Sequence, residues 1–176
     1  MSNKLSEIIL KGLQSENDKY VVEAIKSIRK STNTGYLPYV LALLETNQPE
    51  SVIREISSLL NDIRDKESTT YIVEAIKNPK IKKYLHLVVS SCWISDNDFG
   101  EHLMTFTDLV LKENYQVAFE ALTVIENSLH RVSDKDKELC LDRLNSEIEN
   151  VSADKRQLVG ELVKIVENFK DISDLN

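Results

Sequence analysis

The side chains best suited to bind a metal ion gather in one stretch, HLVVSSCWISDNDFGEH, which spans residues 86–102. They are His86, Cys92, Asp96, Asp98 and His102, and imidazole, thiolate and carboxylate groups are the usual ligands of zinc and related ions. Two ligands on one helix share a face when they lie three or four residues apart, whereas His86 and Cys92 are six apart. We therefore predict no metal and no cofactor. An enzyme, or a protein that binds a metal or a small molecule through this region, remains the alternative.

Catalysis finds little support elsewhere in the sequence. Ser90 and Ser91 lack the G-x-S-x-G turn of a nucleophilic serine, and the three histidines do not define an acid–base pair. We therefore predict that the chain is not an enzyme. Cys92 and Cys140 have no paired spacing, so we expect two reduced, buried thiols. Trp93, the sole tryptophan, is expected to pack in the core.

Composition favours one helical domain that covers residues 1–176. Of the residues, 41% are hydrophobic and 29% are charged, and only 4 Gly and 3 Pro are present to form β-turns. No stretch has the roughly 20 apolar residues of a membrane span, and the polar N-terminus is unlike a secretory signal, so we expect a cytoplasmic protein without membrane contact. The net charge of −7 repels a polyphosphate backbone, so we expect no nucleic acid partner.

One apolar template recurs along the chain. In residues 43–63 the apolar residues that begin at Val52 fall at offsets 0, 4, 7, 8 and 11, which form one stripe on an α-helix. Copies begin at Ile81, Val117 and Leu158. A weaker copy begins at Val21, and Arg29 and Thr32 occupy its last two positions. The starts are 31, 29, 36 and 41 residues apart, close to the length of helical-hairpin repeats.

Partner helices fill the intervals between these copies. Apolar residues at helical spacing place them around residues 3–15, 36–46, 68–77, 100–112 and 135–150. Asn, Asp, Ser, Pro and Gly in the connections are residues that cap or stop helices. The sequence thus predicts an all-α fold, a right-handed α-α superhelix or short solenoid of about five antiparallel helical hairpins. A non-repetitive helical bundle is the alternative.

Two stretches carry a resemblance to a known family. PESVIREISSLLNDI and YQVAFEALTVIENSL are similar to second helices of HEAT-like (armadillo-type) repeats, with Val52, Ile56 and Leu59 at family positions in the first and Val117 and Ala121 in the second. The resemblance spans most of the chain. It implies a non-catalytic scaffold or adaptor that binds a protein or peptide on the concave face of its second helices. A nucleic acid binder of the same type is a further alternative.

The second helices supply the candidate binding residues. They carry a net charge of +4, whereas the rest of the chain carries −11, so we expect a basic ridge that suits an acidic segment of a protein partner. Five of these residues are polar: Lys26, Lys30, Arg54, Lys83 and His86. Three apolar residues lie at the same outward offsets: Leu87, Phe119 and Leu122. The apolar residues either form a hot spot or pack between hairpins.

Overall fold

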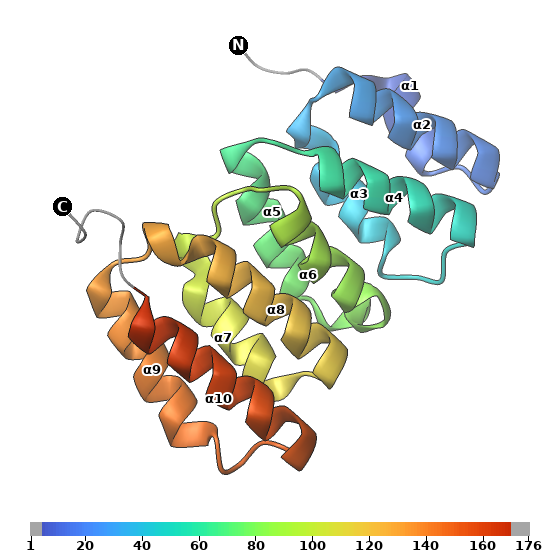
Figure 1. Cartoon of the computed structure of the whole chain (residues 1–176). Helices are drawn as coiled ribbons and strands as arrows, with labels where there is room; N and C mark the ends of the chain where they lie inside the picture. The colour runs from blue at the N-terminus through green and yellow to red at the C-terminus, as the bar shows by residue number, and fades with distance from the viewer. Residues whose placement is uncertain (1–4, 170–176) are drawn as a thin grey trace. The chain divides into compact units, whose positions relative to one another are not determined.

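The computed structural model describes residues 5–169, and within this range it contains ten α-helices and no strand. The helices are α1 (Glu7–Leu13), α2 (Asp18–Ser31), α3 (Leu37–Leu43), α4 (Glu50–Asp62), α5 (Lys66–Ile76), α6 (Leu85–Ile94), α7 (Leu103–Lys112), α8 (Tyr115–Ser128), α9 (Asp134–Glu147) and α10 (Ala153–Asn168). Four 3-10 helices join them: η1 (Thr34–Tyr36), η2 (Pro79–Tyr84), η3 (Gly100–His102) and η4 (Leu129–Arg131). The prediction of alternating first and second helices is confirmed (Figure 1).

Side-chain caps begin several helices where the connections predicted them. The Asn17 side chain accepts a hydrogen bond from the backbone N–H of Lys19 at the start of α2, and the Ser133 side chain accepts from that of Asp136 at the start of α9. The template copy that begins at Ile81 differs from the prediction of a continuous helix. Residues 79–84 form the 3-10 helix η2, and the α-helix α6 begins only at Leu85. Pro79 stands in the first turn of η2, where a residue without an N–H loses no hydrogen bond.

The chain forms two compact units, residues 1–97 (the N-terminal unit) and residues 98–176 (the C-terminal unit). In the N-terminal unit α2 packs on α4 and α4 on α6, while α3 packs on α5 and α1 on α2. The second helices α2, α4 and α6 therefore form one layer, and the first helices form the other (Figure 1). The assignment of residues 1–176 to a single domain stays a prediction.

The repeat template forms the core of the N-terminal unit. Val52, Ile56 and Leu60 on α4 are fully buried, as are Val88 and Val89 on α6. Because the buried residues of α4 recur four positions apart, and Leu85, Val88, Val89 and Cys92 of α6 fall on one face, each of these helices turns one apolar stripe away from solvent. The opposite side of the same helices stays accessible and carries basic residues predicted for the ridge, among them Lys30 and Arg54.

The C-terminal unit repeats this arrangement with α7, α8, α9 and α10. Helix α8 packs on α7 and α10, while α9 packs on α7 and α10. Cys140 on α9 is buried beside Thr107 on α7, with 3.2 Å between Oγ1 and Sγ. Cys92 is also buried, so the prediction of two buried, unpaired thiols is confirmed.

A buried lysine also joins helices of the C-terminal unit. The Nζ of Lys155, in the first turn of α10, donates hydrogen bonds to the carbonyl oxygens of Val110 at 3.2 Å, Leu111 at 2.7 Å and Glu113 at 2.7 Å. The last carbonyl groups of an α-helix have no partner within the helix. Lys155 supplies that partner at the end of α7, and its cation also faces the negative end of the helix dipole. Burial lowers the pKa of this lysine from its ordinary value.

Candidate functional site

The predicted basic residues of the N-terminal unit lie on the accessible side of its second-helix layer. Lys26 on α2 is half-buried and forms an ion pair with Glu23 at 3.4 Å. Arg54 on α4 is exposed and pairs with Glu50 at 3.0 Å. Both ion pairs join neighbouring turns of one helix and are open to solvent, so they hold their side chains only weakly. Lys30, near the end of α2, is exposed.

The predicted residues at η2 and α6 lie further along the same layer. Lys83 in η2 is exposed, and its Nζ donates to Asn47 Oδ1 at 2.6 Å and lies 5.2 Å from the ring centre of Tyr84. His86 and Leu87 on α6 are half-buried. The two contacts orient the ammonium group of Lys83.

The predicted binding residues Phe119 and Leu122 belong to α8, in the C-terminal unit. Phe119 is 50% exposed, which leaves its ring accessible. Leu122 is only 7% exposed. Of the two options that the sequence left open for Leu122, the structure shows packing, because its side chain lies on the same helix stripe as the buried residues Ala118 and Ile125.

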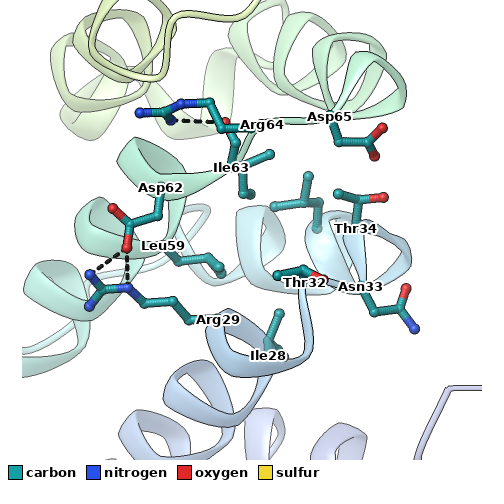
Figure 2. A pocket seen from close by; sticks show the side chains of 11 residues that line it. Ile28, Arg29, Thr32, Asn33, Thr34, Leu59, Asp62, Ile63, Arg64 and Asp65 are labelled. Atoms are coloured by element: carbon teal, nitrogen blue, oxygen red, sulfur yellow. Dashed lines mark hydrogen bonds and ion pairs between the residues drawn. The ribbon is translucent and has the colours of Figure 1, made fainter.

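The structure also contains a pocket that the sequence analysis did not predict. This α2–α4 pocket has a volume of about 280 Å³ and opens where α2 and α4 end (Figure 2). Its floor consists of four buried apolar side chains: Ile28, Leu37, Leu59 and Ile63. A pocket with such a floor gains free energy by taking up an apolar group from water.

Polar groups form the rim of the α2–α4 pocket. On one side the guanidinium of Arg29 pairs with the carboxylate of Asp62, as the dashed lines in Figure 2 mark. The side chain of Arg64 donates to the carbonyl oxygens of Asn61 at 2.7 Å and Ile63 at 3.2 Å. Asp65 caps α5 by accepting from the backbone N–H of Glu67 at 3.3 Å. The acidic and basic groups of this rim balance one another.

A second hollow lies on the other side of the Arg29–Asp62 pair. This basic depression has a volume of about 480 Å³ and is lined by Lys26, Arg29, Lys30, Glu55 and Asp62. It includes two of the residues that the sequence predicted for the ridge. Because Arg29 and Asp62 line both hollows, their ion pair is a wall that the α2–α4 pocket and the basic depression share.

The repeat template contains the signal that marks the pocket. Arg29 and Thr32 occupy the last two positions of the template copy that begins at Val21. In the copy that begins at Val52, the same two positions hold Leu60, on α4, and Ile63, which follows the end of α4. Leu60 is fully buried, whereas Arg29 and Thr32 are exposed. Thr32 also takes the left-handed backbone conformation, with φ 53°, and so ends α2. Two apolar side chains are therefore missing at this position of the array, and the space they leave forms part of the pocket.

The segment from His86 to His102 does not converge on a site within the described residues. The boundary between the two units falls at residues 97 and 98, so His86, Cys92 and Asp96 belong to one unit and Asp98 and His102 to the other. Among residues 5–169 no group of three or more His, Cys, Asp or Glu side chains is arranged to hold a metal ion. Burial raises the pKa of the Cys92 thiol, which disfavours the thiolate that metal binding requires.

Trp93 differs from the prediction. Its side chain is 37% exposed at the end of α6, so the expectation that it packs in the core is wrong. The preceding residue, Cys92, completes the buried stripe of the helix, and one further residue turns the side chain by about 100°.

Comparison with solved structures supports the repeat. The chain is similar to a designed armadillo repeat protein in complex with the peptide (KR)4, with 14% sequence identity and a TM-score of 0.50. The alignment covers 90% of this chain and 80% of that chain. The all-α helical-repeat solenoid class predicted from the template is thereby confirmed. No family model and no curated protein matches the sequence.

None of the helices between residues 5 and 169 combines the length and the apolar character that a bilayer crossing demands.

Proposed function

We propose that the protein is a non-catalytic scaffold or adaptor of HEAT-like type, and that it binds a protein or peptide on the second-helix layer of its N-terminal unit. The observation that carries this proposal is the pair of hollows between α2 and α4, one apolar and one lined by Lys26 and Lys30. The likeness to an armadillo repeat protein that was solved with a peptide supports the same kind of function.

The charge distribution favours an acidic partner segment. Residues 1–97 contain 13 basic and 12 acidic residues, whereas residues 98–176 contain 9 basic and 17 acidic ones. The acidic surplus of the chain therefore lies in the C-terminal unit, and the N-terminal unit is the part that tolerates a negative partner. The peptide of the designed repeat protein is basic, whereas the lysines of the basic depression favour an acidic segment here. A cytoplasmic location and the absence of nucleic acid partners remain predictions.

Selection from a random peptide display library on the immobilised full chain tests this function. We expect wild-type protein to enrich peptides rich in Asp and Glu, and the double variant Lys26→Glu, Arg54→Glu to lose that enrichment. A double variant with the same change of charge on the first-helix layer, Lys11→Glu, Lys77→Glu, serves as the control and should select the same peptides as wild type. Equal selection by all three proteins would contradict a binding role of this layer.

The alternative of an enzyme or ligand-binding protein rests on the segment from His86 to His102. Its most reactive side chain, Cys92, is 1% exposed, and its Sγ donates to the carbonyl oxygen of Val88 at 3.4 Å. A thiol in this position is a packing residue, because neither a substrate nor a metal ion reaches it without local unfolding. The second-helix layer is therefore the better supported site.

A further inference from the structure

The α2–α4 pocket has the size of a side chain. Its volume of about 280 Å³ lies just below the range of about 300–1,000 Å³ in which proteins hold small molecules, and it suits one bulky apolar side chain. The floor residues are already buried in the free protein, with exposed fractions between 0% for Leu37 and 9% for Ile63. The pocket is thus formed before a partner arrives, so little ordering free energy is lost on binding.

The charges next to the pocket are arranged unevenly. On the pocket side Arg29 and Asp62 neutralise each other. On the other side, in the basic depression, Lys26 and Lys30 face a single further carboxylate, that of Glu55. Lys26 also has the exposed ion pair with Glu23 described above, which water screens. The group that complements the basic depression is therefore a carboxylate, and the group that complements the pocket is uncharged.

The shared wall sets the spacing between these two groups. A segment that crosses the Arg29–Asp62 pair reaches both hollows with side chains on one of its faces. Such side chains are two residues apart in an extended segment and three or four apart in a helix. The Arg29–Asp62 pair is itself open to solvent, with side-chain exposures of 42% and 51%, so its guanidinium is able to exchange Asp62 for a carboxylate of the partner.

We infer that the α2–α4 pocket is the anchor site for a protein segment that carries a bulky apolar residue two to four positions from an aspartate or glutamate. The apolar side chain fills the pocket, and the carboxylate lies over Lys26 and Lys30. This inference rests on the proposed function and names the chemistry of the partner.

Titration of the 15N-labelled full chain with short peptides, followed by two-dimensional NMR, tests the inference. The probe is an acetylated, amidated pentapeptide with the sequence Asp-Asp-Gly-Phe-Gly, in which the phenylalanine lies two and three positions after the aspartates. Two matched peptides replace the phenylalanine by alanine or the aspartates by lysines. We expect the probe to shift the amide signals of Thr34 and Ile63 at the pocket and of Lys30 at the depression. Each matched peptide should bind at least about tenfold more weakly, because it loses either the buried apolar group or the charge pairing.

Two variants, each with a matched control variant, locate the binding site. Thr34→Phe places a ring at the pocket rim and should abolish the shifts, whereas Thr70→Phe, on an exposed position of α5, should leave them unchanged. Lys30→Glu should weaken binding about tenfold, whereas Lys19→Glu, an equal change at the other end of α2, should not. Spectra of all four variants with the dispersion of the wild type establish that they are folded.

The outcomes separate this inference from the function on which it rests. Shifts confined to Arg54 and Lys83, with equal affinity for the phenylalanine and alanine peptides, would overturn the anchor site and keep a peptide-binding layer. Stronger binding of the lysine peptide would overturn the inferred charge. An absence of shifts on α2, α4 and α6 with every peptide would count against both the anchor site and the proposed function.

Discussion

The guanidinium of Arg29 pairs with the carboxylate of Asp62, so the ends of α2 and α4 are tied together by residues 33 positions apart in the sequence. This pair forms the wall between the α2–α4 pocket and the basic depression. Both side chains are about half exposed, and an ion pair of that kind contributes little to stability because water and salt screen it. Its position next to two hollows is the basis of the recognition role that we infer for it.

A double-mutant cycle with Arg29→Ala and Asp62→Ala measures this contribution to stability. We expect a coupling free energy below about 1 kcal/mol in urea unfolding, and a smaller value when salt is added. The local pair Arg54 and Glu50, whose side chains are 68% and 90% exposed, provides a more exposed comparison and should show an even smaller coupling. A coupling above about 2 kcal/mol, or one that salt does not change, would show that the pair is a structural bond.

Lys155 should be far more important for stability than any exposed lysine. Lys155→Met keeps the apolar stem but removes the ammonium group that donates to three carbonyl oxygens near the end of α7. We expect the free energy of unfolding to fall by about 2–4 kcal/mol, because buried unsatisfied acceptors are costly. Lys164→Met, on an exposed position of the same helix, is the control and should change stability by less than about 0.5 kcal/mol. Equal effects of the two substitutions in urea unfolding would refute the role of Lys155.

The two thiols should be inert in the folded protein. Burial raises the pKa of Cys92 and of Cys140, so neither forms a thiolate at neutral pH. We expect a thiol-labelling reagent to modify neither residue in native buffer and both in denaturant, as mass spectrometry would show. Rapid labelling of native protein at neutral pH would mean that α6 or α9 opens locally.

Raised thiol pKa values also predict an alkaline loss of stability. Below the ordinary thiol pKa of about 8.5 both the folded and unfolded chains keep these protons, so the thiols cause no pH dependence. Above it the unfolded chain releases protons that the folded chain retains, and the free energy of unfolding falls by up to about 1.4 kcal/mol per pH unit for each thiol. Replacing both cysteines by alanine should make urea unfolding curves at pH 8 and 10 differ less than those of wild type.

Two helical glycines should respond in opposite ways to alanine. A Cβ atom at Gly12 would lie 2.9 Å from the Cβ of Ala24, whereas one at Gly160 would lie 4.0 Å from the nearest atom, Cδ1 of Ile148. We expect Gly160→Ala to stabilise the protein by about 0.5–1 kcal/mol through helix propensity, and Gly12→Ala to destabilise it because α1 and α2 must move apart. Thermal unfolding of both variants checks the two signs, and a gain in stability from both would contradict the close approach of α1 to α2.

The sequence allowed the helices to be predicted because their periodicity is a local property. Val52, Ile56 and Leu60 recur at helical spacing, and the structure buries all three. Side chains near the ends of helices were harder to predict, as Trp93 shows, since a shift of one residue moves a side chain from core to solvent. Lys155 carried no signal, because a lysine in a polar stretch is normally solvated. Its hydrogen bonds depend on α7, more than forty residues away.

The α2–α4 pocket arises where the repeat template lacks two apolar side chains, at Arg29 and Thr32. A pocket of this origin differs from the regular repeat by substitutions at only two positions, and reverse substitutions at the same positions can remove it. The substitutions Arg29→Leu and Thr32→Ile would fill this part of the pocket with apolar side chains and leave an ordinary repeat. Recognition in such an array can therefore evolve by substitutions at single positions, without new loops or insertions.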